Sequence, residues 1–238
     1  MSDDRIRIAP RFNGPPDSGN GGYVAGRLAA FLDAPSVRVR LSAPPPLETE
    51  LTIRRDGGAV ELVSGERTFA RAIATDLQLA RPTPPSFDEA VRASRRYRGF
   101  DEHVFPTCFV CGTARSEGDG LRLFPGSLED RDTFACPWRP DASLGDGSGR
   151  VAPEFLWAAL DCPGGFSFPQ PASGAMLLGE IEVRLAGSVD VGEACVLTAW
   201  AIEHVGRKHR TGTALHGADG RCVGVSLATW IELAKTPG

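Results

Sequence analysis

The sequence predicts an α+β protein with two similar halves, each containing one helix followed by a long antiparallel β-sheet. Three observations predict this class. A mostly apolar helical segment occurs once in each half, segments of alternating apolar and polar residues follow each helix, and these segments align between the halves. Because a lone helix that is apolar nearly all round must be covered, we expect each sheet to wrap around its helix.

The composition of the 238-residue chain is ordinary for a globular protein, with 42% hydrophobic and 24% charged residues. A net charge of −4 and a pI near 5.6 offer no basic surface for nucleic acid or an anionic membrane. No apolar run is long enough to span a bilayer, and the N-terminus lacks the apolar region of a signal peptide. We therefore expect a cytoplasmic protein with neither nucleic acid nor a membrane as partner.

The two predicted helices cover roughly residues 22–32 and 153–162. The first follows NGPPDSGNGG at 13–22, a long glycine-rich segment typical of a loop that lines a substrate pocket. The second places Asp161 in its last turn, before Cys-Pro-Gly-Gly is expected to end the helix. Burial and the negative end of the helix dipole both disfavour an ionised carboxylate there, so Asp161 requires a specific explanation.

The strand segments repeat between the halves. Residues 37–51 align with residues 181–195, and residues 72–79 align with residues 226–233, with about ten extra residues between the two segments in the second half. Each aligned segment alternates as a half-buried antiparallel strand does.

Turn and linker signals divide the chain further. Asp-Gly dipeptides at 56–57 and 219–220 indicate hairpin turns. A proline-rich turn and a short charged helix at 80–103 indicate a linker. The predicted domains are an N-terminal domain at 1–80, a linker with a short helix at 81–104 and a C-terminal domain at 105–238.

The six cysteines suggest neither disulfides nor a complete metal site. Disulfides are not expected in a reducing compartment. The only close spacing is Cys108-Phe-Val-Cys111, and no second CxxC or nearby histidine pair completes four zinc ligands. We interpret this pair as a buried turn and expect no metal and no cofactor. A metal shared across a dimer is the less favoured alternative.

Three segments carry a resemblance to a known family. PTCFVCGTARSEGDGLRLF at 106–124 is similar to a C-x-x-C-G…G-L-x-L segment of hotdog-fold acyl-CoA thioesterases. GNGGYVAG at 19–26 resembles the start of the central helix in bacterial members, and ALDCPGG at 159–165 resembles the catalytic-acid segment of phenylacetate-type members. The resemblance covers nearly the whole chain. It implies a double hotdog fold that hydrolyses an acyl-CoA or a related acyl thioester, although the same fold also hosts other activities.

The resemblance implies a site in which glycines that open one helix meet a carboxylate from the other unit. Gly21 and Gly22 open the first helix, but eight residues further on stand Ala29 and Ala30. The second helix has the carboxylate, but the position eight residues before it is a proline, Pro153 in the sequence, which has no N–H to donate. Each half therefore keeps what the other lacks, which predicts one composite site and one inert site.

Roles follow for the residues of this composite site. Asp161 is predicted to be the general base or the nucleophile, and the backbone amides of Gly22 and Tyr23 are predicted to polarise the thioester carbonyl. Gly21 and Asn20 are predicted to contact substrate, with helix capping the favoured role of Asn20. Two alternatives stay open: Asp161 can bond turn amides, and Asp33 is a rival carboxylate that we interpret as a surface cap.

The basic hairpin at 206–212 supplies candidate contacts to coenzyme A. Arg207, Lys208 and Arg210 can bind its phosphates, and a solvated hairpin tip is the alternative. The histidines at 204, 209 and 216 have no carboxylate or serine partner at a recognisable spacing, and no G-x-S-x-G motif occurs. A serine or cysteine hydrolase is therefore not expected.

The leading hypothesis is hydrolysis of an acyl thioester. The alternatives are a non-catalytic hotdog protein that binds acyl-CoA or another acyl ligand, and a hotdog dehydratase or hydratase. The dehydratase or hydratase is disfavoured because neither predicted helix carries a histidine. A homodimer of the tandem chain is expected.

Overall fold

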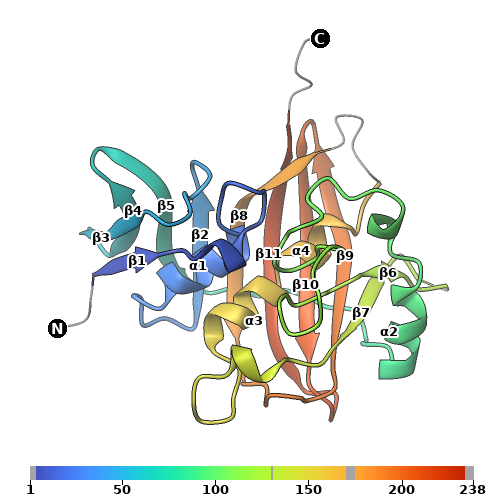
Figure 1. The fold of residues 1–238 in the computed structure, drawn as a ribbon. Coiled ribbons are helices and arrows are strands. Elements are labelled where there is room, and N and C mark those ends of the chain that lie inside the picture. Colours follow the sequence, from blue (N-terminus) through green and yellow to red (C-terminus); the bar gives the residue numbers. More distant parts are fainter. Residues whose placement is uncertain (1–3, 130, 170–174, 234–238) are drawn as a thin grey trace.

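One antiparallel 11-stranded sheet organises the chain, as seen in a computed structural model that describes residues 4–129, 131–169 and 175–233 (Figure 1). The strands are β1 (Arg5–Arg7), β2 (Ser36–Leu41), β3 (Glu50–Asp56), β4 (Ala59–Ser64), β5 (Arg67–Thr75), β6 (Gly126–Ser127), β7 (Phe134–Trp138), β8 (Met176–Leu185), β9 (Cys195–Val205), β10 (Lys208–His216) and β11 (Cys222–Glu232). The helices are α1 (Gly21–Ala29), α2 (Phe87–Ser94), α3 (Pro153–Ala159) and α4 (Cys162–Gly165), with single 3₁₀ turns at Pro10–Phe12, Arg98–Phe100 and Ala142–Leu144.

The strand order places the aligned sequence segments in equivalent positions. The order is β1-β3-β4-β5-β2-β8-β11-β10-β9-β7-β6, so the run β3-β4-β5-β2 in the first half corresponds to β9-β10-β11-β8 in the second. The halves join where β2 and β8 pair antiparallel, with Val37 opposite Val183. At this junction Arg38 Nε donates to Glu182 Oε2 over 2.9 Å.

The second half has the longer strands, which is where its extra residues lie. The strands β9 and β11 each have 11 residues, whereas their counterparts β3 and β5 have 7 and 9. The predicted turns are confirmed, because Gly57 and Gly220 have φ values of 52° and 80°, a region that favours glycine.

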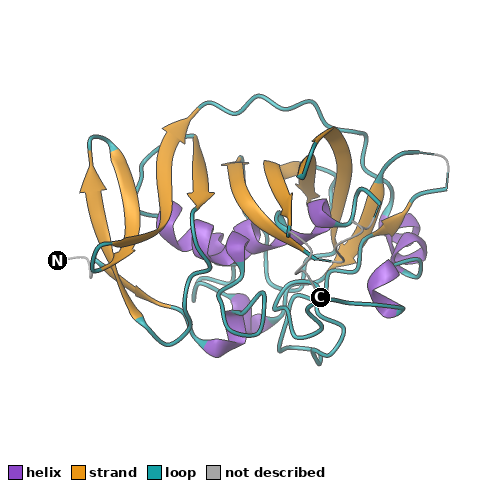
Figure 2. Cartoon of the chain, turned by 90° about the horizontal axis from the view of Figure 1, so that it is seen from above, coloured by secondary structure: helices purple, strands orange, loops and turns teal. Residues whose placement is uncertain are grey.

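The helices α1 and α3 lie on one side of the sheet, as Figure 2 shows. Helix α1 contacts β2, β4, β5 and β8, and it packs side by side with α3. Their apolar side chains belong to the main core, in which Val24, Leu28 and Leu156 are almost fully buried. No helix within the described ranges is long and apolar enough to cross a lipid bilayer.

The prediction of one helix over 153–162 is wrong. Helix α3 ends at Ala159, Asp161 adopts φ −91° and ψ −84°, and the expected Cys-Pro-Gly-Gly terminator forms the separate helix α4. Pro163 explains the break, because it has no N–H to donate to the carbonyl of Ala159. The first helix also ends earlier than predicted, at Ala29, and residues 30–32 continue as a turn.

The short helix expected between the halves is present as α2. Ser86 and Glu89 form a capping box at its start. Ala90 and Ala93 on its buried face pack with Leu128 and with side chains of β7 and β9. The predicted linker therefore includes a helix that packs on strands of the second half.

Candidate active site

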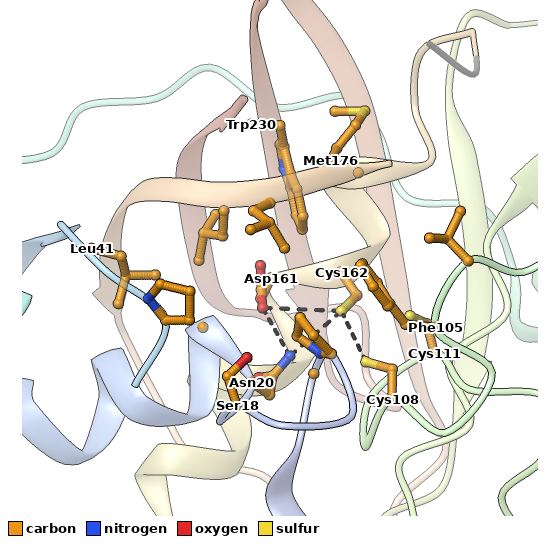
Figure 3. A pocket seen from close by; sticks show the side chains of 18 of the residues that line it. Ser18, Asn20, Leu41, Phe105, Cys108, Cys111, Asp161, Cys162, Met176 and Trp230 are labelled. Atoms are coloured by element: carbon orange, nitrogen blue, oxygen red, sulfur yellow. Dashed lines mark hydrogen bonds between the residues drawn. The ribbon is translucent and has the colours of Figure 1, made fainter. Parts of the chain in front are cut away.

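Asp161 lies at the N-terminus of α1, where the two central helices meet. Its Oδ2 atom accepts a hydrogen bond from the backbone N–H of Gly22 at 2.9 Å. It accepts a second one from Nδ2 of Asn20 at 3.1 Å, which Figure 3 shows. The residue is only 1% exposed. The amide donor and the positive end of the α1 dipole explain why a carboxylate is tolerated in this apolar position.

Two glycines allow α1 and α3 to approach this closely. A Cβ atom on Gly22 would lie 2.5 Å from Cβ of Asp161, and one on Gly26 would lie 2.8 Å from Cα of Glu154. These distances are too short for ordinary contacts, so larger residues would force the helices apart. Gly22 is thus needed both for helix packing and for the hydrogen bond to Asp161.

Asn20 caps α1, as expected, and also contacts the carboxylate. Its Oδ1 atom accepts the backbone N–H of Tyr23 at 2.9 Å, while its Nδ2 atom donates to Asp161. The predicted role of the Tyr23 amide must be corrected, because the Asn20 side chain occupies that donor. The Gly22 amide is likewise occupied by Asp161. The backbone N–H of Gly21 has no hydrogen-bond partner among the described residues.

A mostly apolar cavity of about 310 Å³ opens beside the carboxylate. Its wall is formed by the glycine-rich loop before α1, the 41–45 segment, the ends of β8 and β11, and residues next to the CxxC segment and the α3–α4 break. The residues that line it include Gly14, Pro15, Ser18, Asn20, Gly21, Leu41, Pro44, Phe105, Asp161, Met176, Leu178 and Trp230. The Oδ1 atom of Asp161 is buried and has no hydrogen-bond partner among the described residues. Figure 3 shows this oxygen on the side of the carboxylate away from Asn20, toward Trp230.

The surroundings of Asp161 change its acidity. The pKa of its carboxyl group is raised from 3.8 to about 7, mainly by burial and to a smaller extent by the nearby Cys108. The hydrogen bonds from Gly22 and Asn20 act in the opposite direction. A carboxyl group in this setting can exchange a proton close to neutral pH.

Three thiols line the same cavity. Cys108 and Cys111 come from the CxxC segment, and Cys162 comes from the first turn of α4. The Sγ atoms of Cys108 and Cys162 are 3.8 Å apart, and Cys162 Sγ is 4.0 Å from Oδ2 of Asp161. The sequence spacing identified the CxxC pair but not the third thiol, which the fold brings from 51 residues further along the chain.

The basic hairpin lies outside this cavity. Lys208 and Arg210 line a neighbouring hollow together with Arg40, and the two hollows share Gly179 and Ile231. The Arg207 guanidinium instead donates to the carbonyl of Glu232 over 3.4 Å and lines neither hollow.

The histidines differ from their expected surroundings. No carboxylate stands at a recognisable sequence spacing from His209, but its Nε2 atom lies 2.7 Å from Oε1 of Glu232, because β10 and β11 pair side by side. His103, outside both predicted helices, lines the cavity and accepts the N–H of Phe105 at Nδ1. Among the residues of the predicted inert site, Ala29, Ala30 and Pro153 line neither hollow.

No family model matches this chain, and no curated protein matches it in sequence. Solved structures do match it in fold. The TesB protein of Mycobacterium avium subsp. paratuberculosis gives a TM-score of 0.60 at 13% identity, covering 97% of this chain and 92% of its own. The acyl-CoA thioesterase II TesB2 of Mycobacterium marinum gives 0.59 at 13% identity, covering 95% and 91%. A conserved protein of unknown function with a hotdog fold from Alicyclobacillus acidocaldarius gives 0.61 at 12% identity, covering 98% and 93%.

These similarities establish the fold. The chain is an α+β protein with the hotdog fold, as the sequence resemblance predicted. At such identities they do not extend to activity.

Proposed function

We propose that this chain hydrolyses an acyl thioester, with an acyl-CoA as the substrate, at a composite site between α1 and the α3–α4 junction. The observation that carries the proposal is the unpartnered Oδ1 of Asp161 in a mostly apolar cavity. A buried carboxylate oxygen without a donor is costly, and it persists where its free lone pairs have a function. The hotdog fold, shared with proteins named as acyl-CoA thioesterases, supports the same substrate class.

The proposed reaction uses groups already in place. The acyl chain occupies the apolar part of the cavity near Leu41, Met176 and Trp230. The free N–H of Gly21, at the positive end of α1, donates to the thioester oxygen, in place of the amides of Gly22 and Tyr23. Asp161 removes a proton from water as that water adds to the carbonyl carbon. The carbon–sulfur bond then breaks and Asp161 gives its proton to the departing thiolate, so that the products are the free thiol and a carboxylic acid, which loses its proton to solvent.

We place the phosphates of coenzyme A in the neighbouring hollow. Arg40, Lys208 and Arg210 bring three cationic side chains there, and Glu180 and Glu203 also line it. Arg207, predicted to join them, is directed to a backbone carbonyl instead. Replacing Lys208 and Arg210 with alanine should raise KM for acyl-CoA and leave KM for the same acyl group on pantetheine unchanged. Equal changes for both substrates would contradict this placement.

The domain organisation belongs to the same proposal. We divide the chain into an N-terminal hotdog domain at 1–80, a connecting segment at 81–104 and a C-terminal hotdog domain at 105–238, each sheet wrapped around its helix. The equivalent strand order of the two halves supports the division. We also propose a homodimer of the whole chain, for which light scattering should give twice the 25.3 kDa mass. A mass of one chain at high concentration would refute it.

Asp161→Asn tests the central assignment. Asparagine keeps the shape of the side chain and its oxygen can still accept the Gly22 N–H, but it cannot take a proton. Turnover of a panel of short, long and aromatic acyl-CoAs should fall on the order of 10²–10⁴-fold. Asp33→Asn, at an exposed carboxylate beyond the C-terminal end of α1, is the matched control and should keep the wild-type rate.

Two outcomes would overturn the proposal. Wild-type protein that binds acyl-CoA without turnover would identify a binding protein instead. Hydration of crotonyl-CoA would identify a hydratase, a second candidate that the position of His103 on the cavity wall favours.

A further inference from the structure

A cluster of three thiols adjoins the proposed site without a role in the hydrolysis. Cys108 and Cys111 lie in the loop that follows the connecting helix, and Cys162 lies in α4. All three are buried, and their Sγ atoms lie within 4.8 Å of one another (Figure 3). Two parts of the chain that are far apart in sequence therefore present three soft donors to one point.

The spacing of these sulfurs suits a tetrahedral metal ion. With zinc–sulfur bonds of about 2.3 Å, two sulfurs on one tetrahedral zinc lie roughly 3.8 Å apart. The Sγ atoms of Cys108 and Cys162 are 3.8 Å apart with no rearrangement. Three thiolates are also the ligand type that selects zinc over magnesium or calcium.

The CxxC segment is folded as a tight turn. Gly112 closes the turn by donating to the carbonyl of Cys108 at 2.9 Å, and a Cβ at this position would lie 2.5 Å from two carbonyl oxygens. A turn closed in this way holds Cys108 and Cys111 in a fixed relation, which lowers the cost of ordering them around an ion.

We propose that Cys108, Cys111 and Cys162 bind one zinc ion, whose fourth ligand is a water molecule on the cavity side. All three cysteines line the cavity, so the fourth position is reachable from it. The ion would tie the CxxC loop to α4, next to the peptide that carries Asp161. The proposal differs from the expectation of a metal-free turn, and it would explain why three thiols stay together in a mostly apolar core. The proposal does not depend on the hydrolytic function, because metal binding is measured without turnover.

The test is metal content and cobalt substitution of the full-length protein, purified under reducing conditions without chelator. Elemental analysis should give one zinc per chain. Cobalt added to the chelator-treated protein should produce thiolate-to-cobalt charge transfer and the intense visible bands of a tetrahedral ion. Loss of a residue that merely supports a metal ligand weakens metal binding on the order of 10-fold to 100-fold. Serine at Cys108, Cys111 or Cys162 removes a ligand itself and should weaken cobalt binding by at least as much. Cys222→Ser, at a cysteine outside the cluster, should bind as the wild type does.

Other results would overturn the proposal. Mass spectrometry that finds a disulfide between two of the three cysteines in freshly purified protein would assign the cluster to redox chemistry. Reduced wild-type protein that shows no cobalt charge-transfer band would refute a metal site, whatever the folding of the variants. Loss of cobalt from Asp161→Asn, with full retention by the cysteine variants, would assign the ion to the carboxylate instead.

Discussion

Replacing Gly22 with alanine should damage the proposed site far more than it damages stability. The added methyl group would lie 2.5 Å from Cβ of Asp161 and 2.8 Å from the carbonyl oxygen of Trp157. Ordinary contacts of a Cβ atom begin near 3.4 Å, so the helix start and Asp161 must separate by roughly 0.9 Å. A displacement of about 1 Å at a reacting group costs on the order of 10²-fold in rate.

Gly26→Ala is the matched control on the same face of the same helix. Its methyl group would lie 2.7 Å from Cβ of Trp157 and 2.8 Å from Cα of Glu154, so the steric conflict is similar but lies one turn away from the carboxylate. Overpacking costs about 1–3 kcal/mol, and alanine in a helix returns up to about 1 kcal/mol. Both variants should therefore lose on the order of 1–2 kcal/mol, or roughly 2–8 °C in Tm for a chain of this size.

Thermal melts and acyl-CoA turnover of the two variants, measured together, decide the matter. Gly22→Ala should lose about 100-fold in kcat/KM, and Gly26→Ala should keep most of its activity at a similar Tm. The reasoning is refuted if Gly22→Ala turns over at the wild-type rate, or if both variants lose activity equally.

Two further predictions concern stability. Arg38→Gln should leave the buried Glu182 carboxylate unpaired at the junction of β2 and β8. We expect a loss of about 2 kcal/mol in the free energy of unfolding, less than for a fully buried pair because Arg38 is half-exposed. Thermal melts should show this loss, and Arg5→Gln at an exposed ion pair should change the Tm little. Burial, with a smaller contribution from Arg81, lowers the pKa of His216, so this side chain binds a proton more readily in the unfolded chain and its own contribution to stability should fall as the pH drops below about 6.5. His216→Gln should flatten this dependence in denaturant titrations at pH 7.5 and 5.5, and an unchanged slope would contradict the assignment.

Local patterns in the sequence predicted much of the fold. Alternation located β2 and β8 and parts of β5 and β11, and the Asp-Gly turns located two hairpins, because both signals depend on neighbouring residues. The meeting of Gly22 and Asp161 could also be predicted, since each half lacks what the other keeps. That inference needed the repeat and the family resemblance, because no local signal connects residues 139 positions apart.

Long-range contacts could not be predicted. Which strands lie side by side decides that His209 meets Glu232, and no spacing in the sequence expresses that pairing. The position of Cys162 beside the CxxC pair depends on the break before α4, which the apolar pattern concealed. The hydrogen bond from the amide of Tyr23 to Asn20 depends on the side-chain geometry of one turn. The sequence does not specify that geometry, so it cannot show that this amide is already occupied.

The sheet has little free edge to offer a second chain. The central strands β2 and β8 pair with each other, so the outermost strands are β1, with three residues, and β6, with two. Arg5 and Arg7 on β1 pair with Glu50 and Glu48, which places charged groups along that edge. Short, charged edges are poor templates for strand addition. We therefore expect copies of this chain to associate through faces or loops and not by adding strands at β1 or β6.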